Sequence, residues 1–132
     1  MATAEHLEGY LNKLGRRYER LEDSTYLVAL DANQPPVALR VAPPVLVIQV
    51  QIGAAPAADS PDSARLFRRL LSLNAQGLMH VAYALENQTI VLCAARELDT
   101  LDLNELEAVL ADIGVALAEH VPLLRQMATK GA

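Results

Sequence analysis

The C-terminal part of the chain carries the strongest periodic signal in the sequence. From residue 103 onward, apolar residues recur at alternating steps of three and four, the spacing that places side chains on one face of an α-helix. We therefore expect a long helix over residues 103–128, with Asp102 or Asn104 as its N-cap. Pro122 lacks a backbone N–H and should kink or restart this helix near His120. The stripe consists of Leu103, Leu106, Leu110, Ile113, Leu117, His120, Leu124 and Met127.

A second helical stripe begins near the N-terminus. Apolar side chains again recur at steps of three and four, Thr3 can serve as the N-cap, and Gly9 and Gly15 weaken the pattern only slightly. The pattern predicts one amphipathic helix over residues 4–22. Its apolar residues are Leu7, Tyr10, Leu11, Leu14, Tyr18 and Leu21.

Between these helices the hydrophobic period changes to two, which indicates strands. We expect strands at residues 24–31, 37–42 and 45–52, joined as an antiparallel meander. Prolines interrupt the chain between the strands, because proline cannot donate to a ladder. The third strand has one aliphatic core face, and its opposite face consists of Val45, Val47, Gln49 and Gln51.

The middle of the chain predicts a helix followed by a hairpin. Ser60 and Pro61 are typical of a helix start, and we place this helix at residues 61–74. Strands at 78–85 and 89–95 follow, with a loop at Glu86–Asn87 or Asn87–Gln88. The expected core face carries Met79, Val81, Tyr83, Leu85, Ile90, Leu92 and Ala94. The other face carries small, mildly polar residues that allow another backbone to approach closely: His80, Ala82, Ala84, Thr89, Val91 and Cys93.

These elements define the fold class as α+β, in the order α-β-β-β-α-β-β-α, with an antiparallel sheet packed by helices. The 132 residues suffice for a single domain, residues 1–132. Hydrophobic residues make up 52% of the chain but aromatic residues only 4%, so the core should be aliphatic. Because a small monomer cannot bury so many apolar side chains, a shared apolar interface is expected.

Charge and cysteine content exclude several classes of protein. The net charge is −5, and the two arginine clusters, Arg16–Arg17–Arg20 and Arg65–Arg68–Arg69, lie on expected helices beside acids or apolar residues, so we do not expect nucleic-acid binding. The single cysteine, Cys93, excludes an intrachain disulfide and fits a reducing compartment. Residues 1–21 do not resemble a signal peptide, and the apolar run 43–50 is too short to span a bilayer. We expect a cytoplasmic protein with no membrane partner.

No group of residues predicts a reaction. The three histidines have no metal-ligand spacing, and no glycine-rich loop leads from a strand into a helix. His80 and Cys93 could be neighbours on the hairpin, but no acid would orient such a pair, so a packed thiol is the preferred interpretation. We therefore predict no catalytic, metal or cofactor-binding residues, no cofactor and no enzyme activity.

The sequence between Arg65 and Ile113 resembles the type III secretion chaperone-like superfamily, which includes the Tir chaperone (CesT) type and YbjN-type domains. The resemblance rests on the hairpin 78–95 and on Leu70, Leu71, Leu73, Asn74, Leu98, Leu101, Leu103, Glu105 and Leu106. It implies an acidic bacterial homodimer that holds an extended segment of a partner protein against apolar patches. By this analogy the dimer contact would involve Phe67, Leu70, Leu71 and Tyr83, and Val45 and Val47 would contact the partner.

Two alternatives to this chaperone-like function stay open at the level of sequence. The first is a YbjN-like or roadblock-like signalling regulator or adaptor that binds a folded partner through a flat face. The three-strand meander before the middle helix argues mildly against the roadblock-like form. The second is a small-ligand enzyme, which no residue supports.

Overall fold

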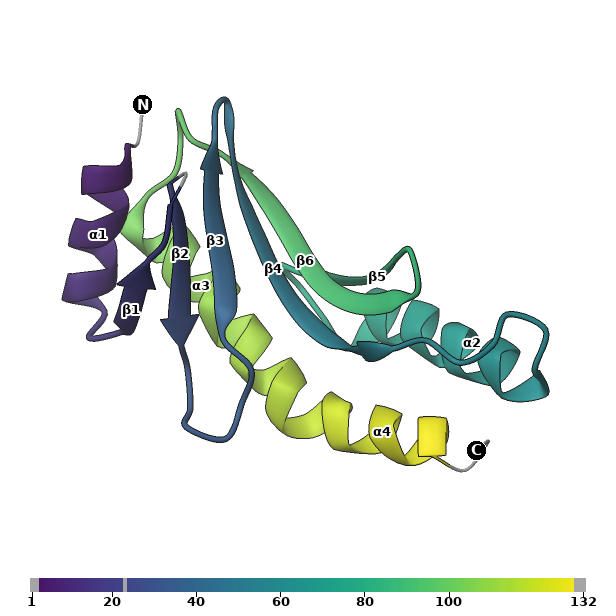
Figure 1. Ribbon diagram of the computed structural model, residues 1–132. Helices are drawn as coiled ribbons and strands as arrows, with labels where there is room; N and C mark the ends of the chain where they lie inside the picture. The colour runs from purple at the N-terminus through teal and green to yellow at the C-terminus, as the bar shows by residue number, and fades with distance from the viewer. Residues whose placement is uncertain (1–2, 23, 130–132) are drawn as a thin grey trace.

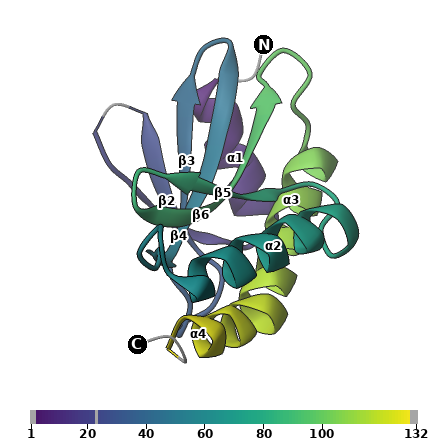
Figure 2. The same ribbon diagram turned by 90° about the vertical axis from the view of Figure 1, so that its right-hand side faces the viewer.

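The computed structural model describes residues 3–22 and 24–129, with side chains up to Gln126. Its strands form one six-stranded sheet in the order β1-β2-β3-β4-β6-β5, and every neighbouring pair is antiparallel. The helices cover one face of this sheet, as Figures 1 and 2 show. The elements are α1 (Ala4–Lys13), β1 (Arg17–Arg20), β2 (Thr25–Ala29), β3 (Val37–Ala42), β4 (Val45–Ala54), α2 (Pro61–Gln76), β5 (Ala82–Glu86), β6 (Thr89–Glu97), α3 (Leu103–Val115), a π-helical segment (Ala116–His120) and α4 (Val121–Thr129). The α+β class with an antiparallel sheet packed by helices is confirmed.

The core lies between the covered face of the sheet and the helices. It is almost entirely aliphatic, as the composition predicted, and Tyr26 is its largest fully buried side chain. Each helix contributes leucines to the same cluster of buried residues, so the helices and the sheet share one core. The bulkiest fully buried aliphatic residues are Leu7, Leu11, Leu39, Leu46, Ile48, Leu66, Leu92, Leu98, Leu106, Leu110 and Ile113.

The expected helix over residues 4–22 is wrong in its second half. α1 ends at Lys13, and Gly15 adopts a left-handed backbone conformation with φ of 69°. Residues Arg17–Arg20 then form strand β1, in which Tyr18 pairs with Val28 of β2. The helical spacing continued by coincidence, because Tyr18 faces the core from a strand and packs edge-on against Tyr26 at 5.9 Å. The element order is therefore α-β-β-β-β-α-β-β-α, with a break in the last helix.

The C-terminal helix is interrupted where Pro122 predicted a break. α3 starts at its N-cap Asp102, whose side chain accepts a hydrogen bond from the Glu105 backbone N–H at 2.7 Å. The chain then widens into a π-helical turn that ends at His120, and α4 continues to Thr129. The missing N–H and the ring of a proline are accommodated by such a local widening of the helix. The side chain of Met127, the last residue of the expected stripe, lies outside the described side chains.

The hairpin occurs with the second of the two expected loops but is displaced along the chain. Glu86 pairs with Thr89, so the loop is Asn87–Gln88. β5 begins only at Ala82, because the Asp112 carboxylate of α3 accepts hydrogen bonds from the backbone N–H groups of Met79 (3.1 Å) and His80 (2.8 Å).

The burial of three hairpin residues differs from the expected burial. Met79 and Leu85, both expected in the core, are 87% and 52% exposed. Val91, expected on the small face, is buried.

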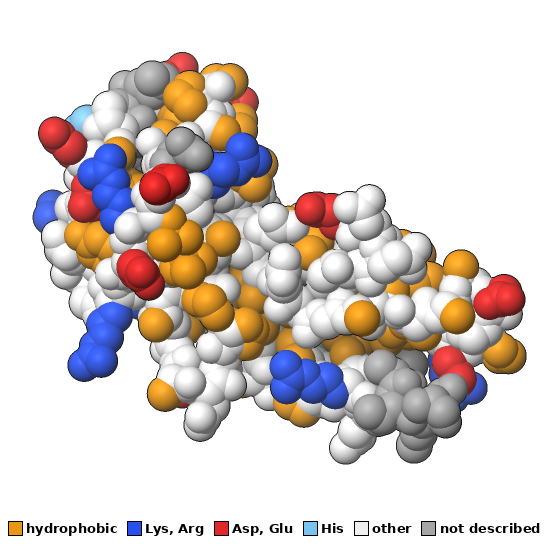
Figure 3. Space-filling model, in the orientation of Figure 1, with side chains coloured by type: hydrophobic (Ala, Val, Ile, Leu, Met, Phe, Trp, Pro, Cys, Tyr) orange, Lys and Arg blue, Asp and Glu red, His pale blue; other side chains and the backbone are white. Residues whose placement is uncertain are grey.

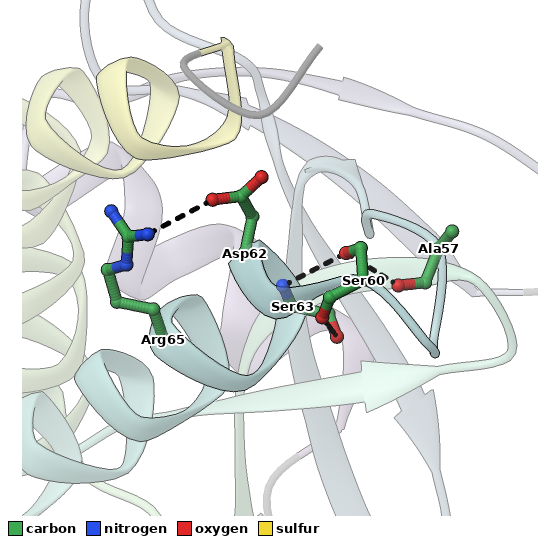
Figure 4. Close-up of polar contacts among 5 residues, drawn as sticks. All are labelled: Ala57, Ser60, Asp62, Ser63 and Arg65. Carbon is green, nitrogen blue, oxygen red and sulfur yellow. Dashed lines mark hydrogen bonds and ion pairs between the residues drawn. The ribbon is translucent and has the colours of Figure 1, made fainter.

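The start of α2 agrees with the sequence prediction (Figure 4). The Ser60 hydroxyl accepts a hydrogen bond from the Ser63 backbone N–H at 3.1 Å and donates one to the Ala57 carbonyl at 2.9 Å. Asp62 lies in the first turn, where it interacts favourably with the helix dipole, and forms an ion pair with Arg65 at 3.3 Å. The helix continues two residues beyond its expected end, to Gln76. The other strand ends shift by a few residues from their expected positions: β2 is shorter, and β4 and β6 are longer.

Candidate protein-binding surface

The second face of the sheet is not covered by any described helix, and we call it the open face. Strand register assigns to it the residues Arg17, Glu19, Thr25, Leu27, Ala29, Ala38, Arg40, Ala42, Val45, Val47, Gln49, Gln51, Ala82, Ala84, Glu86, Thr89, Val91, Cys93, Ala95 and Glu97. Most of these side chains are half-buried or exposed. Figure 3 looks onto the part of this face formed by β2 and β3, where hydrophobic side chains gather with charged ones around them. The open face therefore offers another molecule an apolar patch bordered by charged side chains.

Val45 and Val47, the expected partner-contact residues, both lie on the open face. Val45 is opposite Ala42 of β3 and Glu97 of β6, and Val47 is opposite Arg40 and Ala95. Both valines are half-buried although no helix covers them. Their position results from the alternation of β4, which directs Leu46 and Ile48 into the core and the valines to the other side.

Two adjoining depressions lie on the open face at the β1 side of these valines. One has a volume of about 360 Å³ and is lined by Leu27, Pro35, Pro36, Ala38, Gln49 and Gln51. The other has a volume of about 340 Å³ and is lined by Arg17, Tyr18, Glu19, Leu27, Ala29 and Pro36. They share Leu27 and Pro36, so together they extend across the open face from β4 to β1. The sequence pattern had not indicated them, because they depend on how the loop before β3 folds over the sheet.

On the other part of the open face, a polar contact covers Val91. The Gln49 side chain donates a hydrogen bond to the Glu86 carboxylate at 2.8 Å. Gln49 lies on β4 and Glu86 on β5, the two strands that flank Val91 of β6. Cys93 lies beside them, opposite Gln49 and Ala82. Burial, with a smaller contribution from Glu86, raises the pKa of the Cys93 thiol, so the thiol is protonated at neutral pH. This is the opposite of the activation that a nucleophilic cysteine requires.

A second apolar surface lies along α2 and the outer edge of β5. The structure divides the four residues expected at a dimer contact into two pairs. Leu70 and Tyr83 are 7% and 5% exposed and belong to the core of the chain itself. Phe67 is half-buried, whereas Leu71 is 69% exposed. The exposed Leu85 of β5, which the sequence had assigned to the core, adds to this surface, and we call Phe67, Leu71 and Leu85 the α2–β5 strip.

Tyr83 joins three elements at the inner side of this strip. Its backbone N–H and carbonyl are hydrogen-bonded to the Asn74 side chain of α2, at 2.7 and 3.1 Å. Its hydroxyl lies 3.3 Å from His120 Nδ1 at the end of the π-helical turn. Burial, together with the negative charge of Asp112, raises the pKa of Tyr83 to about 12. Tyr83 therefore holds α2, β5 and the C-terminal helix together.

The histidines do not converge on a site. His6 caps the start of α1, where its Nδ1 accepts a hydrogen bond from the Thr3 backbone N–H at 3.1 Å. His80 precedes β5 and His120 ends the π-helical turn. In the described part of the chain, no three His, Cys, Asp or Glu residues form a group that could hold a metal ion. None of the helices within residues 3–22 and 24–129 is both long and apolar enough to cross a membrane.

Solved structures with the same arrangement define the class of protein. A chain of the heterodimeric complex ExoU–SpcU from the type III secretion system of Pseudomonas aeruginosa is 21% identical, with a TM-score of 0.69 over 89% of this chain and 96% of that chain. The Yersinia pestis type III secretion chaperone SycH, crystallised with a fragment of YscM2, is similar with 17% identity and a TM-score of 0.59, over 87% of this chain and 96% of that one. YbjN from E. coli gives 13% identity and a TM-score of 0.60, over 86% and 90%. The fold is that of type III secretion chaperones and YbjN.

The sequence assigns the chain to a family within this class. A family model described as CesT_Tir_1 matches residues 1–130, so the chain belongs to the CesT_Tir_1 family. The resemblance inferred from the hairpin and the C-terminal stripe is thereby confirmed. No curated protein matches the chain.

Proposed function

We propose that this protein is a homodimeric, non-enzymatic binding protein of the bacterial cytoplasm that holds an extended segment of a partner protein on the open face of its sheet. The observation that carries the proposal is the open face itself: an apolar surface with two depressions, bounded on one side by the free edge strand β1. The similar chain from the ExoU–SpcU complex and SycH with its YscM2 fragment were both solved with protein partners. These complexes support a protein partner for this chain as well.

The edge strand β1 supplies backbone groups that an extended segment can pair with. Leu21 donates its N–H to the Thr25 carbonyl of β2 at 2.7 Å. Because hydrogen-bonding direction alternates along a strand, the N–H and carbonyl groups of Tyr18 and Arg20 point away from β2. Across the described residues, these outward groups have no hydrogen-bond partner. A strand added here would receive main-chain hydrogen bonds, and its side chains would reach the depression beside Arg17.

The α2–β5 strip supports dimerisation. Leu71 and Leu85 are two large apolar side chains that are more than half exposed on neighbouring elements. Asn74 and Tyr83 join α2 to β5 at this place, so the strip is presented on a rigid support. A second copy of the chain that covers the strip would bury these side chains.

The proposal is tested with the partner that the wild-type protein captures from the lysate of its own cells. We expect Val45→Asp and Val47→Asp, placed together, to abolish capture, because two carboxylates on the open face oppose burial under a partner. Ser72→Asp, at an exposed position of α2 away from the open face, is the control for added charge. Capture that persists at wild-type level in the double variant would contradict the assignment of the open face.

The bound region of the partner separates this function from the alternative of a regulator that binds a folded protein. Limited proteolysis of the complex should yield a short protected segment of the partner that is unfolded when isolated. Protection of an entire folded domain of the partner would favour the YbjN-like or roadblock-like alternative.

A further inference from the structure

The two edges of the sheet differ in how many backbone groups they leave unpaired. A strand at the edge of a sheet presents N–H and carbonyl groups that can pair with any other strand, including an edge of a second copy. At the β1 edge, the outward groups of Tyr18 and Arg20 are consecutive and free in the described structure. Strand β5 has the same number of residues whose backbone groups point outward, but the backbone groups of one of these residues are already hydrogen-bonded.

This residue is Tyr83, and a single side chain forms hydrogen bonds with both its backbone N–H and its carbonyl. Asn74 Oδ1 accepts a hydrogen bond from the Tyr83 N–H at 2.7 Å, and Asn74 Nδ2 donates one to the Tyr83 carbonyl at 3.1 Å. The amide side chain thus makes the pair of hydrogen bonds that a neighbouring strand would make. Since outward groups alternate along a strand, only Leu85 is left outward and unoccupied within β5.

We propose that Asn74 closes the β5 edge to strand pairing, both with a second copy of this chain and with a partner's strand. Helix α2, which runs beneath β5 and β6 in Figure 2, holds this amide in place. The closed edge lies beside the α2–β5 strip, where two copies are expected to meet. Asn74 therefore makes that contact one between side chains rather than a continuous sheet. This last step rests on the proposed function: with the β5 edge closed, β1 is the edge that receives an extended segment of the partner protein.

A purely structural role for Asn74, tying the end of α2 to β5, uses the same two hydrogen bonds. The two roles differ in what happens when the amide is removed from a chain that still folds. With a structural role, only stability changes. With edge closure, the freed Tyr83 and Leu85 backbone groups pair with the same groups of another copy. The readout must therefore be pairing between β5 edges, and it must be separate from stability.

Ala84 provides that readout. It is exposed, lies between Tyr83 and Leu85, and pairs with Val91 on the inner side. When two β5 edges pair antiparallel about this residue, the two Ala84 positions face each other as a non-hydrogen-bonded pair. Their Cα atoms are then about 4.5 Å apart, within the range that a disulfide spans. Ala84→Cys in a Cys93→Ser background therefore reports edge pairing by cross-linking under mild oxidation.

We expect this reporter to cross-link weakly with Asn74 in place and several-fold more after Asn74→Ala. Asn74→Asp keeps the acceptor for the Tyr83 N–H but loses the donor for its carbonyl, so it should give an intermediate yield. Ser72→Ala, an exposed change two residues away on α2, is the control and should leave the yield unchanged. Circular dichroism verifies that each variant is folded. Equal cross-linking with and without Asn74 in folded proteins would overturn the proposal.

Amide hydrogen exchange on the wild-type protein tests the premise, shared by both roles, that Asn74 occupies the Tyr83 backbone. The Tyr83 amide should exchange much more slowly than those of Tyr18 and Arg20, although all three point outward from edge strands. Comparable exchange at the three positions would also overturn the proposal. Neither experiment involves the partner protein, so a failure here leaves the proposed function standing, and loss of the partner site leaves the closure of β5 standing.

Discussion

Tyr83 shows how one residue can join several elements of the structure. It was expected to contact a second subunit, yet its ring is buried and its backbone and hydroxyl bind Asn74 and His120. A hairpin residue on the core face has the same sequence pattern whether a helix of its own chain or a second subunit covers it. The sequence therefore placed Tyr83 on the correct face but could not identify what packs against it.

The buried phenol predicts a loss of stability at alkaline pH. Its pKa is raised to about 12 in the folded protein, chiefly by burial and then by Asp112, from an ordinary value near 10. The folded state therefore holds this proton more tightly than the unfolded state. The stabilisation is complete below pH 10 and is lost as the pH rises from 10 to 12; a shift of this size corresponds to about 2–3 kcal/mol.

Urea unfolding of the wild type and of Tyr83→Phe between pH 8 and pH 11 measures this effect. The free energy of unfolding of the wild type should fall more steeply above pH 10 than that of the variant. Parallel pH profiles would show that the phenol ionises equally well in both states.

Individual elements show where local sequence signals are sufficient to predict the bounds of a helix or strand and where they are not. The start of α2, the Asp102 cap and the break before α4 were all predictable, because Ser, Pro and Asp act locally. The end of α1 was not, because Tyr18 continues the helical spacing while it lies in a strand. A continued helix and a turn into a strand differ in the φ of Gly15. The sequence alone does not reveal the φ of a glycine.

The two glycines near α1 should respond oppositely to the same substitution. In both cases a Cβ would meet no other atom within 4 Å, so packing does not decide the outcome. Gly15 has φ of 69°, and Gly15→Ala should destabilise the protein by about 1 kcal/mol because L-residues disfavour that conformation.

Gly9→Ala lies inside α1 and should stabilise the protein by about 0.5–1 kcal/mol through helix propensity. Thermal unfolding of both variants measures the two signs. A neutral or stabilising Gly15→Ala would contradict the turn that separates α1 from β1.

At the scale of the whole molecule, composition predicted an apolar surface in excess of the core but could not locate it. The structure divides that surface between the open face and the α2–β5 strip. Val45 and Val47 were placed on the face away from the core by strand alternation alone. The depressions, the exposure of Leu85 and the closed β5 edge depend on contacts between segments far apart in the chain, which no local pattern encodes.

Dimerisation through the α2–β5 strip is the prediction that belongs to this scale. Leu71→Asp combined with Leu85→Asp should convert the dimer to a folded monomer, because each copy would bury two unpaired carboxylates. Ser72→Asp, at an exposed position adjacent to Leu71, should leave the dimer intact. Light scattering coupled to size exclusion measures the mass of each variant. A wild-type protein that is monomeric at high micromolar concentration would remove this part of the proposal.

On our proposal, β1 and the open face beside it receive an extended segment of a partner protein. The decisive measurement is amide hydrogen exchange of Tyr18 and Arg20, compared between the free protein and its complex with the captured partner. We expect fast exchange at both amides in the free protein and strong protection of both in the complex, because the added strand forms hydrogen bonds with them. Unchanged exchange at both amides in a saturated complex would contradict it.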